Sequence, residues 1–280
     1  SENMDKKDLQ NPALYTNREL SWLLFNKRVL SEARDKQLLL FERLKFLSIT
    51  ASNLDEFFMV RIGSLVDMIH AEYTKKDIAG MSAKEQLDAL MEETHKFAAL
   101  QYSTYNRMLL PQLRANGLNF VEHHEQLTER QAQYVDEYFE ENVYPVLTPM
   151  AVDSSRPFPL IRNKTLNIGA LVAKKGEKDT EIEFATVQVP SVLPRVVRIP
   201  AAKEGDTEVA VLLLEEIIER NISKLFLNYN VLCAHPFRIT RNADLAIDED
   251  EAEDLLLEIE KQIKKRTWGQ AIRLEIEAAA

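Results

Sequence analysis

One long amphipathic stretch, from Phe41 to about Glu72, most constrains what this chain can fold into. Its apolar residues recur at steps of three and four, which places them on one side of a single α-helix. These residues are Leu44, Leu47, Ala51, Leu54, Phe58, Ile62, Leu65 and Ile69. The opposite side lacks the Lys and Glu of a solvated face, so we expect another part of the protein to cover it. That side consists of Phe46, Thr50, Asn53, Phe57 and Arg61.

Two interpretations of Asn53, near the middle of this helix, compete. In the first, Ser52 and Asp55 form a capping box where the helix restarts, and Asn53 is a cap or a solvated side chain. In the second, Asn53 faces a ligand, because an amide both donates and accepts hydrogen bonds and so suits the edge of a nucleotide base. Arg61, roughly 12 Å further along the axis, would then face an anion. The unbroken apolar stripe favours a continuous helix over a restart.

Length and composition indicate a globular protein of one large or two ordinary domains, since the chain has 280 residues with 45% hydrophobic and 29% charged side chains. No apolar run approaches the ~20 residues needed to cross a bilayer, and the first residues lack the apolar core of a signal peptide. The single Cys233 excludes an intramolecular disulfide and a cysteine-only metal site. We therefore expect a cytoplasmic protein, with at most a peripheral membrane association, and we expect Ser1–Asn3 ahead of Met4 to be a cloning remnant.

The charge balance argues against nucleic acid as a partner, because a net charge of −10 repels polyanions unless basic residues gather locally. The one dense basic cluster follows the acidic run Asp248 to Glu260. A helix with acid at its start and base at its end suits the helix dipole, so Asp250 to Lys265 is predicted to be a solvated helix. The basic cluster consists of Lys261, Lys264, Lys265 and Arg266.

Residues 12–117 predict an all-α domain of three antiparallel helices, because short loops join the helical patterns. The first helix begins at a capping box of Thr16 with Glu19, and the third begins at one of Ser82 with Glu85 and stops at Gly117. The second is the long helix already described, and a loop from Thr74 to Met81 follows it. The first helix is expected to bury Trp22, Phe25, Val29 and Ala33.

Residues 118–277 predict an α+β domain, because strands and helices mix there without regular alternation. A capping box of Thr128 with Gln131 opens one helix, and Leu214 to about Phe226 forms another. Lys174 to Thr180 is predicted to be a hairpin turn. The predicted strands are Leu118–Val121, Leu166–Ala173, Ile182–Val189, Val196–Ile199, Val209–Leu213, Val231–Thr240 and Ile272–Ile276.

The inventory of catalytic residues is small. The five histidines include no His-Glu-x-x-His motif and no pair four residues apart, and seven scattered glycines cannot form a phosphate-binding loop. His235 shares one face of its predicted strand with Cys233, a placement more typical of core packing than of a nucleophile and its base. We therefore predict no catalytic residue and no metal ligand in this chain. The other histidines are His70, His95, His123 and His124.

Several longer motifs nevertheless resemble one known family, the long-chain polyphosphate kinases. The most distinctive is RLKFLSITASNLDEFFMVR, from Arg43 to Arg61, which follows ELSWLLFNKRVL at Glu19 to Leu30. The second half agrees as well, in family order from Tyr15 to Ile276. Its motifs are PVLTPMAVD (145–153), RPFP (156–159), VPSVLPR (189–195) and FRITRNAD (237–244).

The resemblance implies an enzyme that moves the terminal phosphate of ATP onto polyphosphate, reversibly, with Mg²⁺ and through a phosphorylated histidine. Family members have a helical N-terminal domain, an α+β head that takes part in dimer contacts, and two C-terminal domains that hold the phosphohistidine. The resemblance therefore implies that this chain stops before the catalytic histidine. It also implies that Asn53, which matches the family's ATP-binding asparagine, contributes to the ATP site.

Two functions follow as alternatives. In the first, the chain is the N-terminal and head portion of a polyphosphate kinase and is inactive alone. It would form one wall of the ATP site, and the C-terminal domains would dock on the second side of the long helix. ATP and Mg²⁺ would then belong to the longer enzyme, with neither held tightly here, and a dimer or higher oligomer is expected. In the second, the chain is a dimerisation or regulatory module that never contacts nucleotide.

Overall fold

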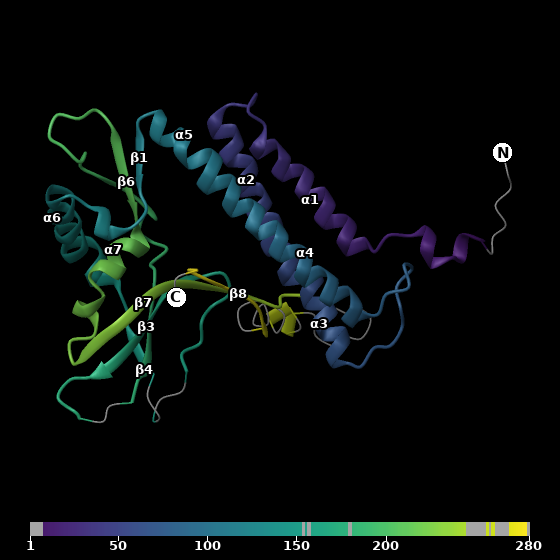
Figure 1. Ribbon diagram of the computed structural model, residues 1–280. Coiled ribbons are helices and arrows are strands. Elements are labelled where there is room, and N and C mark those ends of the chain that lie inside the picture. The colour runs from purple at the N-terminus through teal and green to yellow at the C-terminus, as the bar shows by residue number, and fades with distance from the viewer. Residues whose placement is uncertain are drawn as a thin grey trace. The chain divides into compact units, whose positions relative to one another are not determined.

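The computed structural model describes residues 8–152, 155, 158–178, 181–244, 256–257, 259–260 and 269–278. The fold is mixed, as predicted, with an N-terminal helical region and a head that combines helices and sheets (Figure 1). Contacts divide the chain into a helical unit, Ser1–Gln112 with Thr240–Ile272, and a head unit, Leu113–Ile239 with Arg273–Ala280. The division into domains at 12–117 and 118–277 stays a prediction, and the sequence did not indicate that residues after Thr240 group with the helices.

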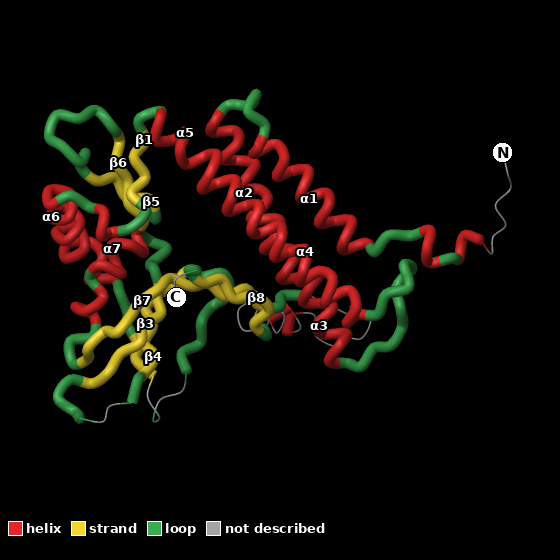
Figure 2. The backbone as a smooth tube through the Cα atoms, viewed as in Figure 1, coloured by secondary structure: helices red, strands yellow, loops and turns green. Residues whose placement is uncertain are grey.

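The helical unit consists of long helices that lie side by side, with α1 packed on α2 and α4 and with α3 packed on α4 (Figure 2). Two of the long helices contain a π-helical turn in which the hydrogen-bonded loop is one residue wider. The helices are α1 Arg18–Arg34, α2 Leu40–Glu56, α3 Gly63–His70, α4 Ala83–Ser103 and α5 Leu110–Ala115, and the π turns are Phe57–Ile62 and Thr104–Leu109. Two short 3-10 helices, Asp8–Gln10 and Pro12–Leu14, come before α1.

The long amphipathic stretch is one continuous helical segment from Leu40 to His70, which confirms the predicted helix. Of the two alternatives at Ser52, the helix restart is excluded, because α2 runs through that position without a cap. The π turn explains why Leu54, Phe58 and Ile62 follow one another at four-residue steps and are all buried. A wider turn needs the longer step to keep side chains on one side.

The second side of this helix is covered in part by α1. Thr50 and Phe57 are fully buried, the ring of Trp22 stacks on Phe57 with centroids 4.5 Å apart, and Asn26 Nδ2 donates to the Thr50 carbonyl over 3.2 Å. The stacked rings of Trp22 and Phe57 and the side-chain amide of Asn26 fill the space between α1 and this helix. Phe46, Asn53 and Arg61 on the same side are only half-buried, and the expectation that the C-terminal domains dock there stays a prediction.

The helix α1 turns a different face inward from the predicted one. Phe25 is 47% exposed, whereas the polar side chains of Glu19 and Asn26 are buried because each finds partners on other helices. The predicted cap at Thr16 is also wrong, because the Asn17 side chain accepts from the Glu19 and Leu20 amides. The buried residues of α1 are Glu19, Leu23, Asn26, Leu30 and Ala33.

Other helix boundaries follow the predicted chemistry. Capping boxes are present at Ser82 with Glu85 and at Thr128 with Gln131. Gly117 has φ +84°, the left-handed conformation that favours glycine at the end of a helix. In the described part of the chain, no helix combines the length and the apolar character needed to span a membrane.

The head unit contains two sheets with strand orders β1-β6-β5 and β2-β4-β3-β7-β8 (Figure 1). The strands β1 and β6 pair in parallel, whereas β5 with β6 and β3 with both β4 and β7 pair antiparallel. The strands are β1 Leu118–Val121, β2 Met150–Val152, β3 Leu166–Lys174, β4 Glu183–Gln188, β5 Val196–Ile199, β6 Val209–Leu213, β7 Tyr229–Arg241 and β8 Ala271–Ile276. The helices are α6 Glu129–Tyr138 and α7 Leu214–Arg220, with a π turn at Phe139–Val143 and short 3-10 helices at His124–Gln126, Tyr144–Val146 and Ile222–Leu225.

The predicted strands are all present to within three residues at their ends, and the hairpin between β3 and β4 is confirmed. The sequence analysis missed β2, whose three residues follow a proline and carry too little pattern to mark a strand. The predicted helix Asp250 to Lys265 lies largely outside the described residues, as do its basic residues. Those residues are Lys261, Lys264, Lys265 and Arg266.

Candidate functional site

Asn53 is half-buried on α2 and belongs to a chain of polar contacts between the helices. Its Nδ2 donates to Oδ1 of Asn26 over 3.2 Å, and Asn26 donates in turn to the Thr50 carbonyl. The Thr50 hydroxyl accepts from Nε2 of Gln101 on α4 over 3.1 Å. These contacts form a polar ladder of Asn53, Asn26, Thr50 and Gln101. The ladder fixes the orientation of the Asn53 amide, because its partner Asn26 is fully buried.

The ladder leaves one hydrogen-bonding atom of the Asn53 side chain unused. Among the residues that the structure describes, nothing donates to Asn53 Oδ1. The side chain is therefore neither sealed in the core nor free to rotate, since its amide nitrogen is held by Asn26. What it can offer a ligand in this orientation is a hydrogen-bond acceptor.

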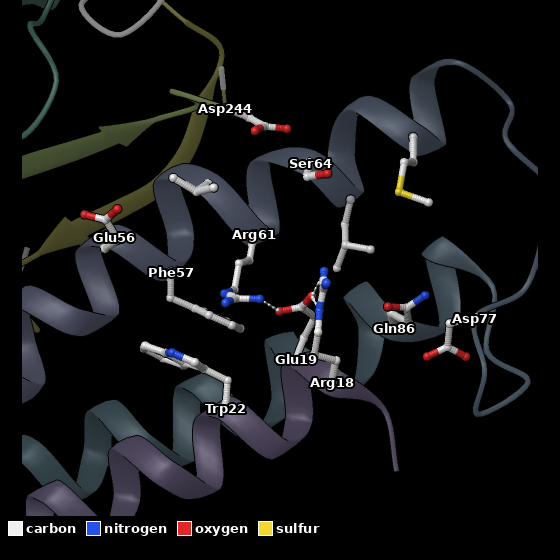
Figure 3. Close-up of a pocket in the computed structure, with 13 residues that line it drawn as sticks. Arg18, Glu19, Trp22, Glu56, Phe57, Arg61, Ser64, Asp77, Gln86 and Asp244 are labelled. Atoms are coloured by element: carbon white, nitrogen blue, oxygen red, sulfur yellow. Dashed lines mark hydrogen bonds and ion pairs between the residues drawn. The ribbon is translucent and has the colours of Figure 1, made fainter. Parts of the chain in front are cut away.

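A cavity of about 580 Å³ opens one helical turn beyond Asn53, with Phe57 and Trp22 at its near end (Figure 3). Asn53 itself does not line it. The walls come from α1, from the segment 56–68, from the loop and helix around Asp77 and Gln86, and from Asp244. The lining residues are Arg18, Glu19, Trp22, Glu56, Phe57, Val60, Arg61, Ser64, Leu65, Met68, Asp77, Gln86 and Asp244.

Arg61 lies in this cavity but its charge is neutralised there. Its Nη1 lies 3.0 Å from Oε2 of Glu19, whose Oε1 lies 2.8 Å from Nη2 of Arg18 (Figure 3). The walls carry two guanidinium groups against the carboxylates of Glu19, Glu56, Asp77 and Asp244. Arg61 thus has a carboxylate partner in an acidic cavity, which does not favour phosphate, and the expectation that it faces the anion of a ligand stays a prediction.

The segment after β7 attaches to the π turn at one edge of this cavity. The Ala243 amide donates to the Met59 carbonyl over 2.9 Å, and Asn242 Nδ2 donates to Oδ1 of Asp67 over 2.9 Å and to the Gly63 carbonyl over 3.3 Å. A side chain at Gly63 would collide with Asn242, so glycine is required for this close approach. Two of the sequence motifs, 43–61 and 237–244, therefore meet in the helical unit.

Two family profiles together match most of the chain. Residues 130–280 match the family profile described as "Polyphosphate kinase middle domain", and residues 15–121 match "Polyphosphate kinase N-terminal domain". The chain belongs to the polyphosphate kinase family. The family resemblance inferred from the motifs is thereby confirmed.

Relatives within the family are longer than this chain. "Polyphosphate kinase" of Halalkalibacterium halodurans is 49% identical over 271 residues, which are 96% of this chain but 38% of that protein. The protein of the same name from Lactiplantibacillus plantarum is 48% identical over 263 residues, 94% of this chain and 36% of that protein. The crystal structure of polyphosphate kinase from Porphyromonas gingivalis superposes with a TM-score of 0.72 at 29% identity, covering 89% of this chain and 37% of that one. The chain thus spans little more than a third of the relatives it matches.

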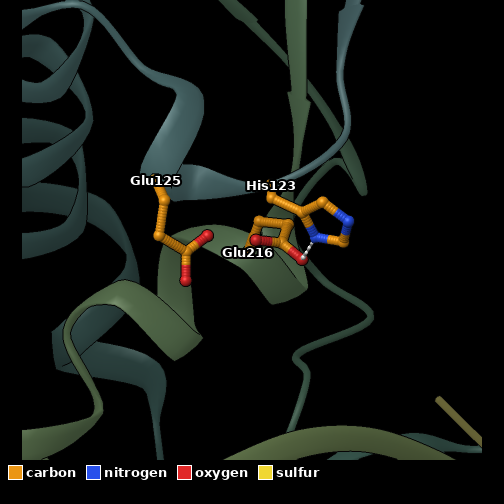
Figure 4. Close-up of side chains that lie close together, drawn as sticks. All are labelled: His123, Glu125 and Glu216. Carbon is orange, nitrogen blue, oxygen red and sulfur yellow. Dashed lines mark ion pairs between the residues drawn. The ribbon is translucent and has the colours of Figure 1, made fainter. Parts of the chain in front are cut away.

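Three of the five histidines, His123, His124 and His235, lie beside α7 in the head unit. His123, Glu125 and Glu216 bring ligand atoms within 4.8 Å of one another, with His123 Nδ1 3.7 Å from Glu216 Oε1 (Figure 4). His235 belongs to a second such group with Glu219 and Glu277. The sequence analysis missed both groups because their members are scattered along the chain, and no local spacing signals them.

The carboxylates around α7 lie in an electrostatically unfavourable place. Burial, and after it the neighbouring charges of Glu216 and Glu277, together raise the pKa of Glu219 to about 8. Burial also raises the pKa of Glu216 and lowers that of His124. The predicted core position of Cys233 beside these groups is wrong, because its thiol is exposed. His70 and His95 are exposed in the helical unit.

Proposed function

We propose that this chain is the N-terminal and head portion of a polyphosphate kinase and that Asn53 forms part of the wall of its ATP site. In this proposal the longer enzyme transfers the terminal phosphate of ATP to polyphosphate, reversibly and with Mg²⁺, through a phosphohistidine outside this chain. The head unit contributes dimer contacts. The chain alone is expected to synthesise no polyphosphate.

The observation that carries the proposal is the state of the Asn53 amide. Asn26 holds its Nδ2, so its half-buried Oδ1 is presented as an acceptor in a fixed orientation. An adenine base carries an exocyclic amino group at C6, which is a donor, whereas hypoxanthine carries a carbonyl oxygen there. A fixed acceptor therefore favours adenine, because an oxygen facing an oxygen leaves both without a partner.

The triphosphate and the magnesium ion are not assigned to this chain. A phosphate group needs cations around it, and the arginines nearest to Asn53 in the cavity, Arg18 and Arg61, share Glu19. The residues present therefore fit the base end of the nucleotide. Bound Mg²⁺ would supply charge neutralisation of the phosphates, and the residues that hold it belong to the C-terminal portion in this proposal.

The test uses a polyphosphate kinase whose N-terminal portion is this sequence. Asn53→Ala should raise the KM for ATP about tenfold, the value of one well-placed hydrogen bond, with the KM for polyphosphate unchanged. The wild-type enzyme should discriminate against inosine triphosphate, and Asn53→Ala should remove most of that discrimination. Steady-state kinetics with both nucleotides measure it.

The matched control is Ser52→Ala, which changes the exposed neighbouring side chain and should leave both nucleotide KM values unchanged. The alternative, a dimerisation or regulatory module that never contacts nucleotide, predicts a different result. It requires Asn53→Ala to leave the ATP kinetics and the ATP/ITP ratio untouched while the oligomeric state changes in sedimentation experiments. That outcome would overturn the proposed ATP-site role.

A further inference from the structure

Three side chains from three different elements of the head unit converge beside α7. Glu219 lies on α7, His235 lies on β7, and Glu277 directly follows β8. One ligand atom of each lies within 4.8 Å of the others, and His235 Nδ1 lies 3.1 Å from Glu277 Oε2. All three residues are half-buried. Groups held by a helix and two strands are positioned more rigidly than groups on a loop.

Glu219 is the unexplained member of this group. Its Oε2 is buried, and within the described ranges neither of its oxygens accepts a hydrogen bond. The adjacent cation, Arg220, turns elsewhere and binds Asp136 at 2.9 and 3.2 Å. Buried carboxylate oxygens are normally hydrogen-bonded or bound to a cation, so an oxygen with neither indicates a missing partner.

The surroundings make that partner a cation. Carboxylates surround Glu219, because Glu277 lies in the same group and Glu215 and Glu216 precede it on α7. A positively charged ion between Glu219 and Glu277 would relieve this repulsion. An imidazole nitrogen beside two carboxylate oxygens is a ligand set for a borderline transition-metal ion such as Zn²⁺, whereas Mg²⁺ prefers oxygen ligands alone.

We propose that Glu219, His235 and Glu277 bind one divalent transition-metal ion of the Zn²⁺ type, with water completing its coordination. The ion would join α7 to β7 and to the residue after β8. Its role is structural and separate from the Mg²⁺ of phosphoryl transfer. The proposal does not rest on the ATP-site role of Asn53, which lies in the helical unit.

The second group, His123 with Glu125 and Glu216, is the weaker site. The side chains of His123 and Glu125 are 53% and 70% exposed, so water competes for them (Figure 4). Glu216 already accepts from the His124 amide over 2.9 Å. This group therefore lacks the unpartnered buried oxygen that distinguishes Glu219, and its residues serve as controls.

The test titrates ZnCl₂ into the 280-residue chain, stripped of metal with EDTA and dialysed, by isothermal titration calorimetry. We expect one ion per chain, a rise in melting temperature on binding, and no competition from millimolar MgCl₂. Glu219→Gln and His235→Gln should each weaken binding at least about tenfold, since each removes a ligand. Circular dichroism confirms that both variants remain folded.

Two controls locate the ion. The double variant His123→Ala/Glu125→Gln should leave the affinity unchanged, and so should Cys233→Ser, which removes the exposed thiol on the same strand as His235. Zn²⁺ that binds Glu219→Gln as tightly as the parent chain overturns the proposal. Loss of binding in His123→Ala/Glu125→Gln but not in His235→Gln overturns it as well, because the ion would then lie at the other group.

Discussion

The helical unit and the head unit each withdraw a glutamate of a helix from solvent, and they treat its charge in opposite ways. Glu19 on α1 is 5% exposed and lies between two arginines, with oxygens 2.8 Å from Arg18 and 3.0 Å from Arg61. Glu219 on α7 has a buried oxygen without a hydrogen bond in the described structure, and other carboxylates surround it. The surroundings thus stabilise the charge of Glu19 in the helical unit and disfavour the charge of Glu219 in the head unit.

The difference extends to the neighbouring polar groups. In the helical unit, Asn26, Thr50 and Gln101 form a ladder in which each member bonds to the next. On α7 of the head, Glu215 is well paired, with Arg195 Nη2 2.8 Å from its Oε1, whereas Glu216, the next residue, and Glu219, one turn further on, gain no arginine or lysine in the described structure. A complete polar network rigidifies a core, and an incomplete one indicates where an ion or a ligand belongs.

The largest effect is expected from breaking the paired glutamate. Glu19→Gln removes a buried anion and leaves the partly buried guanidinium of Arg61 and the exposed one of Arg18 without their carboxylate, so the free energy of unfolding at pH 7 should fall by about 3 kcal/mol. Chemical denaturation measures it. Glu32→Gln, on the exposed side of the same helix, should change the free energy of unfolding by less than about 0.5 kcal/mol. Equal effects of the two substitutions would mean that the Glu19 ion pairs contribute nothing.

The next effect comes from interrupting the ladder. Asn26→Ala leaves the Asn53 amide nitrogen without its acceptor and the Thr50 carbonyl without its side-chain donor. The free energy of unfolding should fall by about 2 kcal/mol, the cost of unsatisfied groups at a buried site. Lys27→Ala, at the exposed neighbouring position, is the control. In the longer enzyme, Asn26→Ala should also raise the KM for ATP, because Asn53 loses its fixed orientation; an unchanged KM would show that the ladder does not position Asn53.

The smallest effect has the opposite sign. The pKa of Glu219 is raised from 4.5 to about 8, so the folded state binds this proton more tightly than the unfolded state, and stability falls as the pH rises through that interval. Glu219→Gln removes this loss. In EDTA it should stabilise the chain by about 1 kcal/mol at pH 8.5, after allowance for solvent screening, and have little effect at pH 4.

Glu215→Gln is the matched control on the same helix. It removes the partner of Arg195 and should destabilise the chain at pH 8.5, where Glu219→Gln stabilises it. Denaturation curves at the two pH values separate the variants. Destabilisation by Glu219→Gln at pH 8.5 would show that this carboxylate is stabilised in the folded state, and the contrast between the units would disappear.

The sequence could predict the features that local chemistry determines. The spacing of Leu54, Phe58 and Ile62 predicted a continuous helix, and capping residues and β-branched runs located most of the other elements. The buried face of α1 was predicted wrongly because Glu19 and Asn26 are polar, and polar residues are expected at the surface. Only their contacts with other helices explain why they are buried. The family motif pointed to Asn53. The fixed orientation of its side-chain oxygen depends on the hydrogen bond to Asn26, which is 27 residues away.

The groups around α7 were beyond prediction for a related reason. Glu219, His235 and Glu277 are separated by strands whose pairing brings them together, and each alone is an ordinary polar residue. The fold also determines that Arg220, the residue next to Glu219, binds Asp136 instead. A motif can be read from adjacent residues, but an unbalanced charge becomes visible only when every neighbour has been placed.

The wide turn at Phe57–Ile62 has a further consequence for how this family's first helix pair can vary. A π turn holds one residue more than the α-helical turn it replaces but advances by about the same rotation, so deleting one residue there would restore a regular helix and leave the rotation of α3 about its axis nearly unchanged. The change would come at the Met59 carbonyl. In the wide turn the Gly63 amide donates to the Phe58 and Val60 carbonyls and leaves the Met59 carbonyl to accept from Ala243, whereas a regular helix would use that carbonyl itself. The extra residue thus supplies an attachment point for the segment after β7, and insertions or deletions should be far better tolerated in the loop at 74–81 than here.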